Sequence, residues 1–309
     1  MARPTAPPPP DLAEACNPAT GHAHTVLVLQ GGGALGAYQG GAYEAFAAAG
    51  ALPDWVAGVS IGAINAALIA GNPPAQRVAR LREFWQRVSA TLPWPAGELP
   101  RAVRGVRNRV AAGAAVAFGI PGFFRPRWPA PGATSLYAIA PLRETLLELV
   151  DFELINRGNV RLSVGAVDVR SGNSVYFDNR RGPIGPGHIM ASGALPPGFP
   201  PVAIDGADYW DGGIVSNSPL WYVFDEAPEL DALVLQVDLF SARGPMPSNL
   251  DEVQERAKDI QYSSKTRFNS TRLRERDELK AAMRRLLDKL VLGVGLRAHG
   301  RDLTIGRST

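Results

Sequence analysis

"VLQGGGALGAYQGG", residues 28–41, follows the aliphatic and β-branched run of residues 25–29 and leads into an alanine-rich stretch. Six glycines in this short segment leave much backbone N–H uncovered by side chains. A buried strand that passes through a glycine-rich turn into a helix is typical of layered α/β architectures. The stretch also raises the question of which chemical group its N–H groups bind.

The segments on either side of this turn alternate between strand-like and helix-like patterns. We predict helices over residues 36–49 and 61–71, and strands over residues 25–29, 55–59, 160–169, 174–178 and 232–240. Strands interleaved with helices from the start favour a three-layer α/β/α sheet with parallel pairing. The 309 residues, 46% of them hydrophobic and 20% charged, have the composition of an ordinary globular protein.

The two ends of the chain differ from this central part. Residues 1–24 contain a proline run, and we expect them to form a flexible arm before a main domain over residues 25–245. Residues 250–309 hold 14 basic and nine acidic side chains, which is a clear shift in composition. The apolar residues of this last part recur at helical spacing, and they predict a basic helical region: Leu279, Met283, Leu286 and Leu290.

Several classes of protein are disfavoured by what the sequence lacks. The first residues show no signal-peptide pattern, and the longest near-apolar stretch, residues 110–120, is too short to span a bilayer as a helix. Cys16 is the single cysteine, so no intrachain disulfide can form and a reducing compartment is expected. No zinc-ligand spacing or RNA-binding signature indicates nucleic acid. We expect a cytoplasmic protein, at most peripheral to a membrane.

One interpretation of the glycine-rich turn is dinucleotide binding. Gly31, Gly33 and Gly36 satisfy the pattern G-x-G-x-x-G between a strand and a helix. That fingerprint requires an acidic residue at the end of the second strand, about 20 residues further on. Asp54 lies near this distance but precedes the strand at residues 55–59 instead of closing it. The pattern alone is therefore a weak indication.

The second predicted strand ends in a serine. Gly58-Val59-Ser60-Ile61-Gly62 is a G-x-S-x-G between a strand and a helix, which is typical of a nucleophile elbow. Both glycine-rich turns follow successive strands, so we expect them at the same edge of the sheet. The N–H groups of Gly31, Gly32 and Gly33 could then stabilise the oxyanion that forms when Ser60 attacks an ester.

A serine nucleophile needs a base, and two kinds of base are available. His188 and His299 could complete a triad with an aspartate, and the order Ser60, aspartate, His299 fits that of α/β-hydrolases. The alternative is Asp211, which precedes Gly212 and Gly213 at a sharp turn. A carboxylate can act as the base directly if burial raises its pKa.

Three ordered blocks resemble the signature motifs of the patatin-like phospholipase family. They are QGGGALGAYQGG (30–41), GVSIGAINA (58–66) and DGGIVSNSPL (211–220), and MASGALPPGFPPVAIDG (190–206) resembles the segment before the family's aspartate. The resemblance implies a Ser-Asp dyad without histidine, in which Ser60 is the nucleophile and Asp211 the base. It further implies an oxyanion hole at Gly31, Gly32 and Gly33, with no metal and no organic cofactor. The remaining motif glycines have supporting roles: Gly36, Gly58, Gly62, Gly212 and Gly213.

The resemblance has one local departure and leaves the exact substrate open. Gln30 stands where family members often carry an aspartate before the glycines. The implied activity is hydrolysis of lipid esters by acyl transfer through Ser60, of the phospholipase A, lysophospholipase or esterase type. A catalytically silent lipid-binding protein of the same fold and a nucleotide-binding oxidoreductase are the alternatives.

Residues 101–130 form a predicted insertion in the catalytic domain. Six arginines and no acidic residue occur between positions 101 and 127, and Leu99, Val103, Val106 and Val110 would share one face of a helix. A basic amphipathic segment of this kind can contact an anionic membrane surface. Two interpretations of the segment are open: a surface excursion whose valines pack on the core, and a lid that contacts such a membrane surface.

Overall fold

The computed structural model describes residues 18–89, 113–127, 131–226 and 231–263, together with residues 275, 278, 279 and 282–286. The chain forms two compact units, residues 1–264 and residues 265–309. In the second unit the described residues are helical, as the spacing of Leu279, Met283 and Leu286 predicts. The predicted arm, apart from residues 18–24, and much of the predicted insertion at 101–130 lie outside the described residues.

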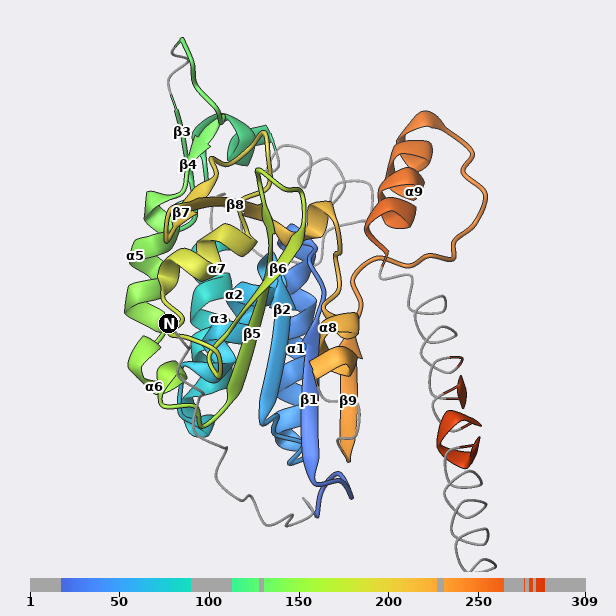
Figure 1. The fold of residues 1–309 in the computed structure, drawn as a ribbon. Helices are drawn as coiled ribbons and strands as arrows, with labels where there is room; N and C mark the ends of the chain where they lie inside the picture. The colour runs from blue at the N-terminus through green and yellow to red at the C-terminus, as the bar shows by residue number, and fades with distance from the viewer. Residues whose placement is uncertain are drawn as a thin grey trace, which may run out of the picture. The chain divides into compact units, whose positions relative to one another are not determined.

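The first unit is built on a mixed β-sheet (Figure 1). Within the described residues, seven strands form it in the order β7-β8-β5-β2-β1-β9, with β6 also paired to β5. Their bounds are β1 (His24–Leu29), β2 (Trp55–Val59), β5 (Arg161–Asp168), β6 (Ser174–Asp178), β7 (Val202–Ile204), β8 (Ala207–Asp211) and β9 (Ala232–Val237). A separate two-stranded sheet pairs β3 (Arg125–Pro126) with β4 (Tyr137–Ala138).

Parallel pairing holds for only part of this sheet. β1, β2, β5 and β9 run parallel, as the alternation of strands and helices predicts. β6, β7 and β8 pair antiparallel, so the sheet is mixed and the predicted parallel pairing does not extend to these three strands. A short turn at residues 169–173 joins β5 to β6, so these two strands form a hairpin that needs no helical crossover.

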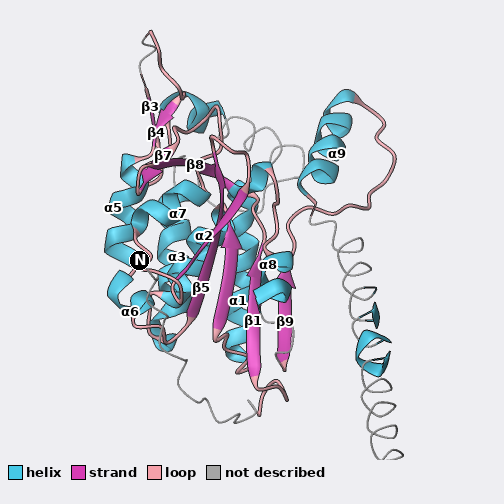
Figure 2. Cartoon of the chain, viewed as in Figure 1, coloured by secondary structure: helices cyan, strands magenta, loops and turns pink. Residues whose placement is uncertain are grey.

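Helices cover both faces of the sheet and give the predicted three layers (Figure 2). The alternation of side chains along β1 sends Leu27 and Leu29 into one core and Val26 and Val28 into the other. The first core also contains residues of α1 (Gly36–Ala48), α2 (Ile61–Ala70), α3 (Pro74–Ser89), α5 (Ala140–Leu149), α6 (Phe152–Asn156) and α7 (Pro186–Ser192). The second contains residues of α8 (Leu220–Glu226).

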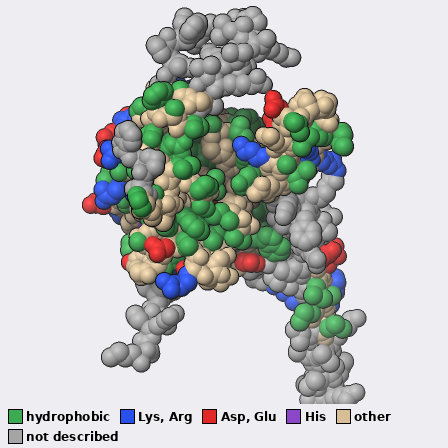
Figure 3. All heavy atoms as spheres, turned by 90° about the horizontal axis from the view of Figure 1, so that it is seen from above, with side chains coloured by type: hydrophobic (Ala, Val, Ile, Leu, Met, Phe, Trp, Pro, Cys, Tyr) green, Lys and Arg blue, Asp and Glu red, His purple; other side chains and the backbone are tan. Residues whose placement is uncertain are grey.

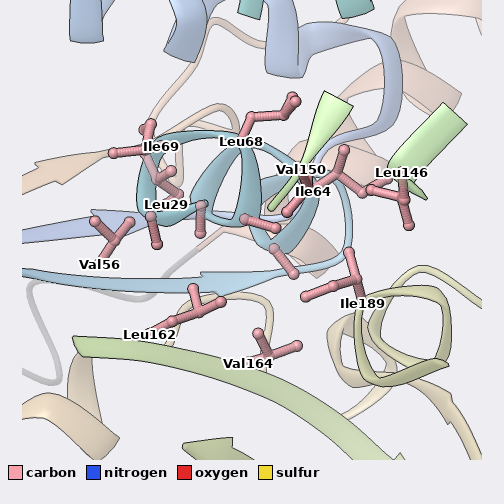
Figure 4. Close-up of a cluster of buried hydrophobic side chains, with 14 of the residues drawn as sticks. Leu29, Val56, Ile64, Leu68, Ile69, Leu146, Val150, Leu162, Val164 and Ile189 are labelled. Carbon is pink, nitrogen blue, oxygen red and sulfur yellow. The ribbon is translucent and has the colours of Figure 1, made fainter. Parts of the chain in front are cut away.

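Helix α2 lies at the centre of the larger core. All ten of its residues are buried, and Ile64, Leu68 and Ile69 pack among strand and helix side chains (Figure 4). Each fully buried Leu or Ile contributes about 1.5–3 kcal/mol to stability, so this helix is firmly fixed. Because Ser60 is its N-cap residue, the same packing fixes the position of the serine.

The edge of β5 brings two distant parts of the chain together. Ala166 and Val167 pair with both β6 and β8, so these two strands occupy opposite edges of β5. Residues 163–165 pair with both β2 and β6, so β2 shares its edge of β5 with β8. Val59 of β2 pairs with Gly165, and Asp211 of β8 pairs with the next residue, Ala166. The end of β8 therefore lies beside the end of β2.

Candidate active site

Ser60 occupies a strained turn between β2 and α2. Its backbone has φ 58° and ψ −127°, which a residue with a side chain rarely adopts. The glycines on either side are required by close approach. A Cβ at Gly58 would lie 2.3 Å from the carbonyl oxygen of Gly62, and a Cβ at Gly62 would lie 2.3 Å from that of Leu29. The G-x-S-x-G pattern thus has the structure of a nucleophile elbow.

A buried serine that the sequence reasoning did not identify holds this turn. The Ser60 N–H donates to Oγ of Ser192 at 2.9 Å, and that hydroxyl donates in turn to the carbonyl of Gly165 at 2.6 Å. Ser192 is fully buried at the end of α7. Its only signal in the sequence is its place within the block at residues 190–206, where a lone serine resembles any other turn residue.

Asp211 ends β8 and directs its carboxylate at this turn. Its Oδ2 accepts a hydrogen bond from Oγ of Ser60 at 2.6 Å, and its Oδ1 accepts one from the N–H of Gly213 at 2.7 Å. The residue is only 2% exposed. Burial raises the pKa of the Asp211 carboxyl from its ordinary value of 3.8 to about 6, although the hydrogen bonds from Ser60 and Gly213 act in the opposite direction.

The two glycines after Asp211 also stand where a side chain has no room. A Cβ at Gly212 would lie 2.6 Å from the carbonyl oxygen of Gly165. A Cβ at Gly213 would lie 2.8 Å from Oδ1 of Asn217 and 3.0 Å from Oδ1 of Asp211. The pair therefore allows the turn to close over the carboxylate.

The first glycine-rich turn lies next to Ser60. A Cβ at Gly31 would lie 3.0 Å from Cβ of Ser60 and 2.2 Å from Oδ1 of Asn217. Gly33 has φ 56° and begins a 3-10 helix, η1 (Gly33–Leu35). At Gly36, a Cβ would lie 2.5 Å from Cγ1 of Ile61, so this glycine lets α1 approach the start of α2. The two turns meet at one edge of the sheet, as their positions after successive strands predict.

The N–H groups of the three glycines have different partners. Gly31 donates its N–H to the carbonyl of Asn217 at 3.0 Å. Among the hydrogen bonds between described residues, none uses the N–H of Gly32 or Gly33. The oxyanion hole was expected to use all three, and this arrangement leaves the N–H groups of Gly32 and Gly33 available to a ligand.

The acidic residue of the dinucleotide interpretation lies far from this turn. Oδ2 of Asp54 accepts from the N–H of Thr25 at 3.1 Å and lies 3.2 Å from Nδ1 of His24. Both partners belong to the beginning of β1, whereas the glycines follow its end. Asp54 therefore lies at the opposite end of the strands and cannot bind a ribose held at the glycine turn.

Within the described residues, no histidine has a hydrogen bond or ion pair with Ser60 or Asp211. His188 accepts the N–H of Gly185 at Nδ1 and packs edge-on against Phe177, and burial lowers the pKa of its imidazole. His22 contacts Asp231, next to the start of β9. The hydrogen bonds that reach the Asp211 carboxylate from described residues come from Ser60 and Gly213. His299 lies outside the described residues.

The described residues show neither a metal-binding cluster nor a membrane-spanning helix. They contain no group of three or more histidine, cysteine, aspartate and glutamate side chains arranged to hold a metal ion. None of the helices in this part of the chain combines the length and the apolar character needed to cross a bilayer.

Comparisons with known proteins give distant structural likenesses and a family match. A solved structure that resembles the chain is VipD from Legionella pneumophila, with 19% sequence identity and a TM-score of 0.37 over 69% of this chain and 49% of VipD. The chain thus spans about half the length of that protein. A search of curated protein sequences finds no match. The family model of patatin-like phospholipases matches residues 27–224, from β1 into α8. The chain belongs to the patatin-like phospholipase family.

Proposed function

We propose that this protein hydrolyses the carboxylic ester bonds of lipids, with Ser60 as nucleophile and Asp211 as general base. Membership of the patatin-like phospholipase family supports a lipid acyl hydrolase. The observation that carries the proposal is the 2.6 Å hydrogen bond from the strained Ser60 to a buried carboxylate. A base whose pKa is raised to about 6 can accept a proton and still be ionised near neutral pH.

In the first step, Asp211 takes the hydroxyl proton as Oγ of Ser60 attacks the ester carbonyl. The negative charge on the carbonyl oxygen is stabilised by the N–H groups of Gly32 and Gly33 and by the positive end of the buried helix α2. When the tetrahedral intermediate collapses, Asp211 returns the proton to the departing alcohol. The products are the free alcohol and an acyl ester of Ser60.

In the second step, Asp211 deprotonates a water molecule that attacks the acyl-serine. The same N–H groups stabilise the second oxyanion, and Asp211 gives the proton back to Oγ of Ser60 as the carboxylic acid leaves. The serine and the carboxylate return to their starting states. The cycle balances without a metal or an organic cofactor.

The edge of the sheet that holds Ser60 exposes apolar side chains that suit a lipid substrate. Leu35 and Tyr38, after the glycine turn, are 48% and 69% exposed, and Ile214 and Val215, after Asp211, are 46% and 55% exposed. Figure 3 looks onto this face, where hydrophobic side chains gather around a hollow. Apolar acyl chains would cover such side chains and remove them from water.

We further propose that the segment before β4 contacts an anionic membrane surface. Of residues 101–127 the structure describes 113–127, and this part exposes both apolar and basic side chains: Val116, Phe118, Arg125 and Arg127. Hydrolysis should rise above the aggregation point of a lipid substrate and be faster on anionic than on zwitterionic vesicles. Equal rates below and above that point would contradict the membrane contact and leave the ester hydrolase in place.

Reaction with a fluorophosphonate probe tests the nucleophile. The wild-type protein should bind one probe per chain, and Ser60→Ala should bind none. Ser171→Ala, at an exposed turn after β5, is the matched control and should label like the wild type. A folded wild type that neither labels nor hydrolyses a panel of lipid esters would instead indicate a catalytically silent lipid-binding protein.

A further inference from the structure

Asn217 holds the residue at the start of the glycine turn from both sides. The N–H of Gly31 donates to the backbone carbonyl of Asn217 at 3.0 Å, and Nδ2 of Asn217 donates to the carbonyl of Gly31 at 3.0 Å. Asn217 is 9% exposed, so water competes little for these bonds. The peptide group before Gly31 is held as well, because the carbonyl of Gln30 accepts from Nε2 of Gln39 at 2.7 Å.

The bond to the Gly31 carbonyl also determines where the next N–H points. A peptide group is planar, and in the trans form its N–H lies opposite its C=O. The carbonyl of Gly31 and the N–H of Gly32 belong to one peptide group. By fixing the carbonyl, Asn217 fixes the direction of the Gly32 N–H, one of the two proposed oxyanion donors.

A single backbone carbonyl accepts from both side-chain amides that flank the turn. The carbonyl oxygen of Tyr262 receives Nδ2 of Asn217 at 2.7 Å and Nε2 of Gln30 at 2.9 Å. Tyr262 is the last residue of α9 (Leu250–Tyr262), where the carbonyls lack partners within the helix and carry partial negative charge. The two amides meet that need.

Helix α9 is held at this point although it has no buried residue of its own. The Tyr262 ring packs against Phe240, and Nη1 of Arg256 donates to the carbonyl of Ser241 at 2.9 Å. Oε1 of Gln30 accepts the N–H groups of Leu239 and Phe240. Gln30 thus joins three segments through hydrogen bonds: the segment after β9, the end of α9 and the glycine turn.

We propose that Gln30 and Asn217 are positioning residues that, through the Tyr262 carbonyl, hold the glycine turn in its catalytic geometry. This inference rests on the proposed hydrolase function and makes α9 part of the catalytic unit. It also gives a role to the departure at position 30, since the amide of glutamine donates to a carbonyl that a carboxylate would repel. Asn217 needs its amide for the same reason, because its Nδ2 faces two carbonyl oxygens.

The test uses two substitutions that change single atoms in the full-length chain. Gln30→Glu keeps an acceptor for Leu239 and Phe240 and alters the group that faces Tyr262. Asn217→Asp keeps the backbone bond from Gly31 and alters the group that faces the carbonyls of Gly31 and Tyr262. Asn173→Asp and Gln76→Glu, both exposed and away from the site, make the same chemical changes as controls.

The rate is measured per active site titrated with the fluorophosphonate probe, so a loss of folded protein does not count. Each variant should lower kcat about 10–100-fold with KM little changed, because a displaced donor acts on the transition state. The double variant should lose little more than the worse single variant, since both break one arrangement. Wild-type kcat per titrated site in either variant, or losses that multiply in the double, would overturn the proposal.

Hydrogen exchange provides a readout that does not depend on hydrolysis. The N–H of Gly31, which donates to the carbonyl of Asn217, should exchange at least about tenfold faster in Gln30→Glu than in Gln76→Glu, because the turn opens more often once its support is lost. Unchanged exchange would count against the proposal even if the wild type proves inactive. Failure of the proposed function would appear differently, as a wild type that does not react with the probe.

Discussion

The side chains of Ser60 and Asp211 meet at 2.6 Å although 151 residues separate them in the chain. They meet because β2 and β8 use the same edge of β5 in succession, with Val59 opposite Gly165 and Asp211 opposite Ala166. The carboxylate is therefore positioned by backbone pairing, while the serine is positioned by the turn into α2. A change in the charge of Asp211 should alter chemistry and stability without moving the backbone.

The first prediction concerns the base. Asp211→Asn should lower kcat for a short-chain ester by at least about 10²-fold, since the amide cannot accept the Ser60 proton. His188→Ala should keep wild-type kcat per titrated site, because His188 contacts Gly185 and Phe177 and has no hydrogen bond to Ser60 or Asp211. A loss of turnover in His188→Ala or His299→Ala that matches the loss in Asp211→Asn would favour a triad with histidine.

The second prediction is the pH dependence of hydrolysis. The pKa of Asp211 is raised to about 6 by burial, so the carboxylate is ionised above that pH and protonated below it. Since only the ionised form accepts a proton, kcat/KM should fall about tenfold per pH unit below about pH 6. A profile measured from pH 4 to pH 9 that stays flat through this range would exclude Asp211 as the base.

The third prediction is the effect of the same carboxyl on stability. The pKa of Asp211 is about 6 in the folded protein and 3.8 ordinarily, so the folded state binds the proton more tightly than the unfolded state. This binding stabilises the folded state fully below pH 3.8, and the stabilisation is lost as the pH rises through 6. The loss is on the order of 3 kcal/mol. Asp211→Asn should therefore have a larger free energy of unfolding than the wild type at pH 8, and the difference should shrink towards pH 4. Denaturant titrations at both values check this, with the exposed Asp208→Asn as control; a difference independent of pH would contradict it.

The fourth prediction contrasts two glycines of α1. Gly36→Ala would push a Cβ to 2.5 Å from Cγ1 of Ile61, the residue after Ser60. We expect a loss of about 1–3 kcal/mol in the free energy of unfolding, and a lower kcat. A Cβ at Gly41 would meet no atom within 4 Å beyond its own stretch of helix, so Gly41→Ala should stabilise α1 by about 0.5–1 kcal/mol. Equal effects in the two variants, measured by denaturant unfolding, would refute the close-approach argument.

The fifth prediction concerns Ser192. Ser192→Ala leaves the Ser60 N–H and the Gly165 carbonyl without the hydroxyl that joins them. The free energy of unfolding should fall by about 1–3 kcal/mol, because two buried polar groups lose their hydrogen-bond partner. The strained turn at Ser60 loses a support at the same time, so kcat per titrated site should fall, whereas Ser174→Ala, at an exposed position, should change neither quantity. A variant with reduced stability and unchanged kcat would limit Ser192 to a structural role.

Local patterns predicted the elements of the site because each depends on short-range sterics. Gly58 and Gly62 flank Ser60 because the neighbouring backbone leaves no room for a Cβ at either position. A constraint of this kind selects the residue type at the position itself, so it can be recognised in the sequence. The antiparallel insertion of β8 beside β2 was not predicted, because strand order depends on contacts between residues far apart in sequence. The resemblance to a family, and not the spacing, connected Ser60 with Asp211.

The parts of the site that could not be predicted are single polar contacts. Ser192 and Asn217 lie inside the quoted motif blocks, yet nothing in their neighbours distinguishes them from ordinary turn residues. The composition shift after residue 249 reflects charged side chains that face solvent. It does not predict that the backbone carbonyl of Tyr262 accepts hydrogen bonds from Gln30 and Asn217. The hydrogen bond from the Gly31 N–H to the carbonyl of Asn217 likewise forms only in the folded chain, so the sequence could not predict it.

The position of β1 between β2 and β9 has a consequence for biosynthesis. During translation Ser60 emerges early, but the second neighbour of β1 is encoded much later in the chain, in Ala232–Val237. Until then the N–H and C=O groups along one edge of β1 have no strand to pair with, and such an unpaired edge can pair with other chains. The acceptor for Gln30 and Asn217 arrives later still, with Tyr262. Under the proposed mechanism, a nascent or prematurely terminated chain would carry Ser60 without a finished turn beside it, and lipid hydrolysis would begin only after Tyr262 has been added.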